Sequence, residues 1–179
     1  QVLPKGFGRV RGIVINAGCS NVCTGKAGLK DAGEMARLTA RRLGCQPDKV
    51  LVASTGVIGH RLPMDKVRAG IDDAAGRLGT DMDAEALRAI MTTDTREKSA
   101  VVQGRIGKAR VTVAGMVKGA GMIAPSMATM ISVITTDAAV APALLHRALR
   151  GTADDSFNAI TVDSDTSTSD TVVLLASGQ

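Results

Sequence analysis

Aromatic residues are almost missing from this sequence. It contains neither tryptophan nor tyrosine, and its two aromatic residues are Phe7 and Phe157. Proteins that bind single-stranded nucleic acid stack bases on aromatic side chains and gather basic residues in a continuous stripe. Here the formal net charge of +5 comes from lysines and arginines scattered along the chain. We therefore expect no nucleic-acid partner, and we expect aliphatic side chains and the eight methionines to fill the core.

Cysteine is scarce too, and long apolar runs are missing. Cys19, Cys23 and Cys45 are odd in number and lack the paired spacing of a zinc site or a disulfide framework. We therefore expect reduced thiols and no bound metal. No apolar run approaches the roughly 18 residues that a membrane span needs. These patterns predict a cytoplasmic protein with no membrane partner.

What the sequence does contain is an alternation of two hydrophobic periods, one typical of strands and one typical of helices. Its 179 residues, 45% of them hydrophobic, suffice for a substantial core. No repeat or low-complexity tract marks a domain boundary, and the predicted class is α/β. The expected strands are 8–17, 49–54, 99–103, 109–115, 130–134 and 172–176, and the expected helices are 29–43, 63–78, 84–91 and 142–149.

Two glycine-bearing segments resemble nucleotide-binding loops without meeting their requirements. Thr24, Gly25 and Lys26 resemble the end of a phosphate-binding loop, but Ala27 stands where such a loop needs serine or threonine for magnesium. Residues 119–121 lack the third glycine of a dinucleotide fingerprint, and a strand is expected after them. A turn that leads into a helix and a tight backbone turn explain these segments better, so no nucleotide cofactor is predicted.

A pair of carboxylates offers a rival interpretation. The hydrophobic residues 160–162 lead into Asp163 and Asp165, the arrangement in which aspartyl phosphatases hold a nucleophile and an acid beside magnesium at a strand end. Ser167 stands where those enzymes usually carry threonine or valine. The phosphatase hypothesis therefore rests on this single motif.

A turn rich in backbone amides is expected after the strand 49–54. Thr55 and Gly56 follow the strand end directly, and glycine recurs at Gly59 before His60. Exposed amides in such a turn can bind an oxygen on which negative charge develops. We assign the functional part of this turn to its amides and to Thr55, and we expect the imidazole of His60 to be a bystander.

The junction between Ala128 and Thr129 is the most informative point of the chain, since a small residue there precedes a threonine and a strand-like run. Cleavage of this bond would make Thr129 a new N-terminus, and its freed α-amino group would then serve as general base for its own hydroxyl. Taken alone, the residue pattern favours a threonine that merely begins a strand, where β-branched residues are common.

Six segments stand out along the chain: NAGCSNVCTG (16–25), STGVIG (54–59), LPMDK (62–66), IMTTDT (90–95), KGAGMIAPSMATM (118–130) and DSDTSTSDT (163–171). Together they resemble the segments of the bacterial ornithine acetyltransferase family. They occur in the family's order, with compatible spacing, over essentially the whole chain. Each motif alone is weak, whereas six in sequence make the resemblance specific.

The resemblance implies a layered α/β fold of the N-terminal-nucleophile-like type, shared by ornithine acetyltransferases and β-peptidyl aminopeptidases, with mixed sheets and helices packed on them. Family members are made as one precursor that cuts itself before a threonine into α and β chains, which remain together as an α2β2 heterotetramer. Residues 1–128 would be the C-terminal part of an α chain and residues 129–179 the start of a β chain, within one folding unit that is incomplete relative to full-length members.

The resemblance also implies an enzymatic activity in arginine biosynthesis. Family members move the acetyl group from N-acetylornithine to glutamate through an acetyl-threonine intermediate. They need no cofactor, and some also accept acetyl-coenzyme A as the donor.

Roles for single residues follow from the same resemblance. Thr129 matches the nucleophile, and Thr55 and Gly56 match the pair that stabilises the oxyanion. Thr92 and Lys118 match positions that contact the substrate together with the nucleophile. Taken without the family, Lys118 fits a solvated loop lysine, and Thr92 fits a hydroxyl at a helix end.

Two alternatives from other functional classes stay open at this point. An N-terminal-nucleophile amidase or aminopeptidase would share the cut before Thr129 but would hydrolyse amides. A non-catalytic interaction domain would leave Thr129 uncut and replaceable without loss of function.

Overall fold

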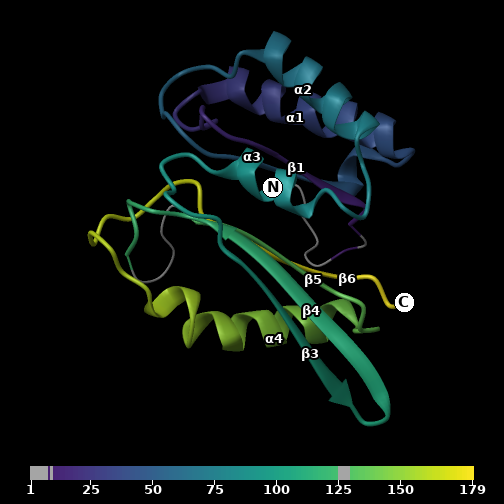
Figure 1. The fold of residues 1–179 in the computed structure, drawn as a ribbon. Coiled ribbons are helices and arrows are strands. Elements are labelled where there is room, and N and C mark those ends of the chain that lie inside the picture. Colours follow the sequence, from purple (N-terminus) through teal and green to yellow (C-terminus); the bar gives the residue numbers. More distant parts are fainter. Residues whose placement is uncertain (1–7, 9, 125–129) are drawn as a thin grey trace. The chain divides into compact units, whose positions relative to one another are not determined.

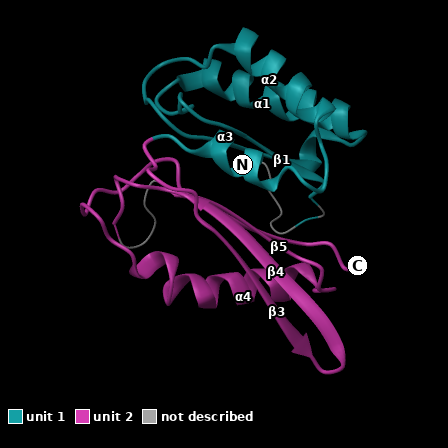
Figure 2. Ribbon diagram, in the orientation of Figure 1, with its two compact units in different colours: residues 1–92 teal, residues 93–179 magenta. Residues whose placement is uncertain are grey.

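The computed structural model describes residue 8, residues 10–124 and residues 130–179. The chain divides into two compact units, residues 1–92 and residues 93–179, which Figure 2 shows in different colours. Each unit combines strands with helices, so the predicted α/β class is confirmed. Within the described residues, no helix combines the length and the apolar character that crossing a membrane would require.

The first unit is built around two parallel strands joined by a helix. Its elements are, in chain order, β1 (Gly12–Asn16), α1 (Gly25–Leu43), the 3-10 helix η1 (Pro47–Lys49), β2 (Val50–Ser54), α2 (Met64–Gly76) and α3 (Asp83–Ile90). The register of β1 and β2 runs from Gly12 opposite Val50 to Asn16 opposite Ser54. Helix α1 packs on both strands, and α2 lies beside α1 (Figure 1). The carboxyl ends of β1 and β2 therefore meet at one edge of this small sheet.

Helix α1 forms because its sequence supplies one buried face and a clear end. The buried residues recur every three or four positions: Gly28, Asp31, Met35, Ala36, Thr39 and Ala40. Gly44 ends the helix in the left-handed conformation with φ of 64°, as the sequence predicts. The helix begins at Gly25 and not at residue 29, so Lys26 lies in its first turn and not in a separate turn before it.

Met35 lies at the centre of the core of the first unit. Its side chain is fully buried and packs with Leu62 and Ile71. Val14 and Val52, one from each strand, pack against this cluster. The core therefore joins α1, α2 and the two strands, and through Leu62 it anchors the segment that connects β2 to α2.

Replacing Met35 with alanine is expected to lower the free energy of unfolding by about 2–5 kcal/mol, because a buried side chain is lost and a cavity remains. Urea denaturation of the full-length protein measures the change. Leu29→Ala on the same helix is the matched control, since Leu29 is 60% exposed. Its truncation should change the free energy of unfolding by less than about 0.5 kcal/mol. Equal losses in the two variants would contradict the central position of Met35.

The second unit is a mixed four-stranded sheet with one long helix. Its elements are, in chain order, β3 (Ser99–Ile106), β4 (Ala109–Lys118), β5 (Ile131–Thr136), α4 (Pro142–Asp154), the 3-10 helix η2 (Phe157–Ala159) and β6 (Thr171–Ala176). The strand order is β3-β4-β5-β6. The first three strands are antiparallel, whereas β5 and β6 are parallel because α4 provides the crossover between them. Figure 1 shows α4 alongside this sheet.

The β3–β4 hairpin is tighter than the sequence predicts. The turn consists of Gly107 and Lys108 alone, and Gly107 has a φ of 61° that suits a two-residue hairpin turn. The expected strands 99–103 and 109–115 leave residues 104–108 between them, so the predicted connection is too long. Gly104 belongs to the strand instead and pairs with Val111.

Helix α4 and strand β4 also extend beyond their predicted ends. Helix α4 passes residue 149 and reaches Asp154, and the Thr152 hydroxyl donates to the Ala148 carbonyl oxygen at 2.9 Å within this extension. Strand β4 passes residue 115 because its pairing with β5 continues to Lys118 opposite Ile131. Lys118 therefore ends a strand, where the sequence predicted a loop.

Candidate active site

The turn that follows β2 contains the predicted pair Thr55 and Gly56. Thr55 is fully buried, and its N–H donates to the carbonyl oxygen of Asn16 at 3.0 Å. This bond continues the β1–β2 pairing by one residue beyond Ser54. The chain then bends at Gly56, whose φ of 127° lies in a region that glycine adopts readily and other residues avoid.

Gly56 also lies against the backbone of the loop that follows β1. A Cβ atom at this position would be 2.5 Å from the carbonyl oxygen of Gly18 and 2.7 Å from the nitrogen of Cys19. Glycine is therefore the residue that fits here. Among the residues that the structure describes, no acceptor takes the N–H of Gly56.

Polar side chains hold the loop after β1 against the turn after β2. The Ser54 hydroxyl donates to Asn16 Oδ1 at 2.6 Å, and Asn16 Nδ2 donates to the Cys19 carbonyl oxygen at 2.7 Å. The backbone N–H of Ser20 donates to the Val57 carbonyl oxygen at 2.8 Å. These bonds fix the turn before any ligand binds, and preorganised donors of this kind are what an oxyanion site requires.

An ion pair fixes the far end of the same turn. Arg61 donates from Nε to Asp31 Oδ2 at 3.0 Å and from Nη2 to Asp31 Oδ1 at 2.8 Å. Asp31 is buried on α1, and its hydrogen bond raises the pKa of the Arg61 guanidinium. His60, directly before this arginine, has an exposed side chain. Two hydrogen bonds between these oppositely charged side chains thus tie the turn to α1.

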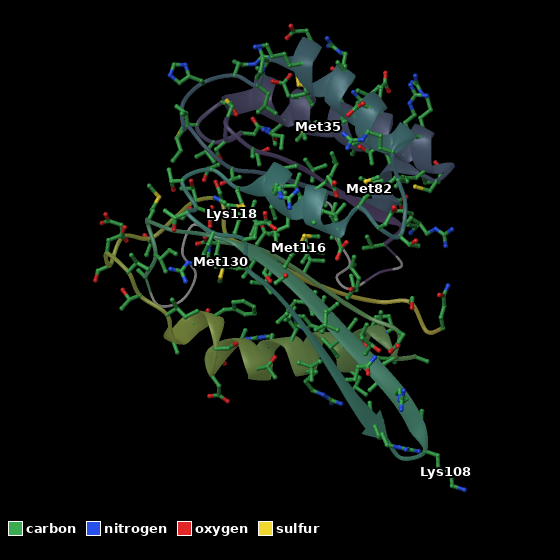
Figure 3. The ribbon with its side chains drawn as sticks, in the orientation of Figure 1. Met35, Met82, Lys108, Met116, Lys118 and Met130 are labelled. Atoms are coloured by element: carbon green, nitrogen blue, oxygen red, sulfur yellow. The ribbon has the colours of Figure 1, made fainter. Side chains whose placement is uncertain are left out.

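Lys118 is buried at the end of β4, with 1% of its surface exposed. Burial lowers the pKa of its amine, while the charge of Asp94 opposes this shift and that of Lys98 adds to it. Figure 3 shows Lys118 near Met116 and Met130 at one end of the sheet. Without the family, the residue pattern suggested that Lys118 is a solvated loop lysine, and this interpretation is therefore wrong.

Asp94 fixes the backbone next to this lysine. Its side chain is 0% exposed, and its Oδ1 accepts from Lys98 Nζ at 2.6 Å and from the Gly119 N–H at 2.7 Å. A buried carboxylate thus holds the residue that directly follows Lys118. Sequence reasoning missed this role, because Gly119 lies 25 residues further along the chain. The only indication in the sequence was that Asp94 lies within the segment 90–95, one of the six segments that carry the family resemblance.

The remaining predicted site residues are distributed as follows. Thr92 is exposed, comes after α3 and is the last residue of the first unit, whereas Lys118 lies in the second. The predicted cleavage pair, Ala128 and Thr129, lies outside the described residues. Their roles stay predictions.

The rival carboxylate Asp163 has a structural role. Residues 160–162 form no strand, so the strand-end arrangement of an aspartyl phosphatase is missing. Asp163 accepts hydrogen bonds from the N–H groups of Ile123 at 2.8 Å and Met122 at 2.6 Å, and these bonds lower the pKa of its carboxyl group. Within the described part of the chain, no three His, Cys, Asp or Glu side chains gather as a metal site would need. The single motif behind the phosphatase hypothesis therefore lacks the strand that this hypothesis needs.

Comparison with known proteins gives matches along nearly the whole chain. Residues 2–179 match the ArgJ family. The arginine biosynthesis bifunctional protein ArgJ of Symbiobacterium thermophilum is 55% identical over 171 residues, which are 96% of this chain and 42% of that protein. ArgJ of Dehalococcoides mccartyi is 52% identical over 174 residues, which are 97% of this chain and 42% of that protein. The chain thus spans less than half the length of these curated relatives.

Two solved structures are similar to this chain. The crystal structure of ArgJ from Bacillus halodurans has a TM-score of 0.58 and 41% sequence identity, and the match covers 66% of this chain and 61% of that chain. The ornithine acetyltransferase of Mycobacterium tuberculosis, solved in complex with ornithine, has a TM-score of 0.55 and 38% identity over 64% of this chain and 61% of that chain. These likenesses confirm the predicted fold type. As the six sequence segments predict, the chain belongs to the ArgJ family.

Proposed function

We propose that the full-length protein transfers the acetyl group of N-acetylornithine to glutamate in arginine biosynthesis, after it cuts itself between Ala128 and Thr129. The observation that carries this proposal is the match of residues 2–179 to the ArgJ family. The names of the relatives refer to arginine biosynthesis, and the similar enzyme of Mycobacterium tuberculosis was solved with ornithine. Because the chain spans 42% of the first relative, the activity is proposed for the whole protein.

The proposed reaction consists of two acyl transfers on Thr129. First, the hydroxyl attacks the acetyl carbonyl, the α-amino group accepts the hydroxyl proton, and this proton passes to the departing nitrogen of ornithine. The threonine then carries the acetyl group as an ester. Next, the amine of glutamate attacks this ester, N-acetylglutamate leaves, and the hydroxyl regains its proton. An α-amine with an ordinary pKa of about 7.7–8.0 suits these proton transfers near neutral pH.

The turn at Thr55 and Gly56 is proposed to stabilise the negative charge that develops on the acetyl oxygen. The N–H of Gly56 and the hydroxyl of Thr55 would donate to that oxygen. The burial of Thr55 and the conformation of Gly56 support this role, since the donors are held in place before the substrate binds. A single donor of this kind contributes about 10²- to 10³-fold to kcat.

Lys118 and Thr92 are proposed to contact the substrate. Both ornithine and glutamate carry a carboxylate, and a buried amine attracts such a group more strongly than an amine in bulk water. The burial of Lys118 supports this role. No cofactor takes part in the proposed reaction, and acetyl-coenzyme A would be an alternative donor.

The pH dependence of the reaction tests the role of Lys118. A lysine amine is a cation below its pKa, and burial lowers the pKa of this lysine from its ordinary value of 10.5. Binding of a substrate carboxylate should weaken as the pH rises through the lowered pKa. The alkaline decline in kcat/KM should therefore occur at a lower pH than the decline that a lysine with an ordinary pKa would produce. Steady-state kinetics from neutral to alkaline pH measure this decline.

The variant Lys118→Met removes the cation and keeps an unbranched side chain. It is expected to lower kcat/KM by about 10- to 100-fold, since a hydrogen bond to a charged group is worth about 1.5–3 kcal/mol. It should also abolish the alkaline decline. Lys108→Met is the matched control, because Lys108 is exposed at the tip of the hairpin (Figure 3). An alkaline decline that persists in Lys118→Met would refute the assignment.

Intact mass spectrometry of the full-length protein tests the proposal as a whole. We expect two polypeptides, one of which begins at Thr129 and gains one acetyl group on incubation with N-acetylornithine. Glutamate should then remove this group as N-acetylglutamate. Release of acetate without transfer would indicate an amidase or aminopeptidase instead, and a continuous, unmodified chain would indicate a non-catalytic domain. Native mass spectrometry of the same sample is expected to show an α2β2 heterotetramer.

A further inference from the structure

One loop holds the backbone on both sides of residues 125–129. This loop runs from η2 to β6, and two of its carboxylates accept hydrogen bonds from distant backbone N–H groups. Asp163 holds the backbone at Ile123, before the segment. Asp170 Oδ1 accepts the Met130 N–H at 2.9 Å, directly after the segment. The two ends of the stretch that contains the proposed cleavage site are therefore both tied to the same loop.

Backbone hydrogen bonds reinforce both attachments. The N–H of Val162 donates to the carbonyl oxygen of Ile123 at 2.8 Å, and the N–H of Thr171 donates to that of Met130 at 2.9 Å. The parallel pairing of β5 and β6 begins at the next residue, with Ile131 opposite Thr171. Met130 is thus held through its N–H by a side chain and through its carbonyl oxygen by the backbone.

Burial makes the charged form of the Asp170 carboxyl group energetically unfavourable. The residue is half-buried, and burial raises the pKa of its carboxyl group while the hydrogen bond from Met130 opposes the shift. The nitrogen that donates this bond is covalently joined to the carbonyl carbon of residue 129. This hydrogen bond therefore holds the first backbone atom that follows Thr129 in the chain.

We propose that Asp170 is a positioning residue for Thr129: its hydrogen bond holds Met130, the residue directly after the nucleophile, and so limits how far the hydroxyl and α-amine can move from the acetyl carbonyl. The proposal rests on the function proposed above. Asp170 acts through Met130 and needs no contact with the substrate. Its loss should lower kcat more than it raises KM, because a small misplacement of a reacting group lowers the rate of the chemical step.

Three variants of the full-length protein test this proposal. Asp170→Asn keeps an oxygen acceptor at the same place, and its kcat should stay within about threefold of the wild-type value. Asp170→Ala removes the acceptor, and kcat should fall by about 10- to 100-fold, with the KM for N-acetylornithine changed by less than about threefold. Asp170→Glu keeps the charge but displaces it by one methylene, and kcat should fall as in the alanine variant. If Asp170→Ala does not fold, the comparison of Asp170→Asn with Asp170→Glu decides.

The controls separate this proposal from the function on which it rests. Asp165→Ala removes an exposed carboxylate from the same loop and should keep the wild-type kcat. Hydrogen exchange at the amide of Met130 should accelerate in Asp170→Ala and Asp170→Glu but not in Asp170→Asn or Asp165→Ala. Wild-type kcat in both Asp170→Ala and Asp170→Glu, or equal losses in Asp170→Asn and Asp170→Ala, would overturn the positioning role. A wild-type protein that is uncut and transfers no acetyl group would instead overturn the proposed function.

Discussion

The variant Thr129→Ala of the full-length protein is expected to stay one continuous polypeptide and to lose acetyl transfer. Alanine has no hydroxyl that could attack either the preceding peptide bond or the acetyl carbonyl, so both the cut and the reaction should fail together. The expected loss in kcat is at least about 10³-fold, as for the removal of other nucleophiles. Gel electrophoresis shows whether the chain is cut, and an assay for N-acetylglutamate measures the transfer.

Two companion variants make this result specific. Thr129→Ser keeps a hydroxyl and should still be cut and acetylated. Thr135→Ala removes an exposed hydroxyl from β5 and should be cut and active like the wild-type protein. An uncut Thr129→Ala protein with full activity would rule out a nucleophile that depends on its own liberated α-amine.

The variant Gly56→Ala is expected to lower kcat by about 10²- to 10³-fold or more, the effect of losing an oxyanion donor. The added methyl group would collide with the Gly18 carbonyl oxygen, which lies 2.5 Å from the ideal Cβ position, and the φ of 127° disfavours any side chain. The turn must therefore move, and its amide moves with it. Single-turnover acetylation of the Thr129 fragment measures the effect on the chemical step.

Gly70→Ala is the matched control for this substitution. Gly70 lies in α2, where an added Cβ meets no atom within 4 Å. Alanine at a helical position without a collision should stabilise the protein by about 0.4–1 kcal/mol and leave kcat unchanged. Equal activity of Gly56→Ala and the wild-type protein would show that this turn does not stabilise the oxyanion.

Local signals in the sequence predicted most of the fold. Gly44 ends α1 as expected, because the left-handed conformation favours glycine and this preference is visible in the sequence. The end of β4 at Lys118 was missed because it depends on pairing with Ile131 in another strand. The prediction ended a strand before Gly104, which lies in β3, and a helix before Gly151, which lies inside α4. Residue preference fixes element types here, while long-range pairing fixes where strands end.

The candidate site was predictable to a different degree. The turn at Thr55 and Gly56 could be predicted because a strand end followed by a glycine-bearing turn is a local pattern, whereas the roles of the two residues stay predictions. The burial of Lys118 had no local signal, since a lysine after a strand is usually solvated. The roles of Asp94 and Asp170 were missed for a related reason. Each accepts a hydrogen bond from a backbone amide distant in sequence, at Gly119 and Met130 respectively, and only the folded chain brings these groups together.

The pairing of β4 with β5 would have a consequence if the proposed cut takes place. A break between residues 128 and 129 would assign these two adjacent strands to separate polypeptides, so the ladder from Val113 opposite Thr136 to Lys118 opposite Ile131 would become a seam between subunits. The two products could then separate only if the hydrogen bonds between β4 and β5, in the middle of the four-stranded sheet, were broken. Dissociation and denaturation of residues 93–179 would be one event, and renaturation would become second order in protein concentration.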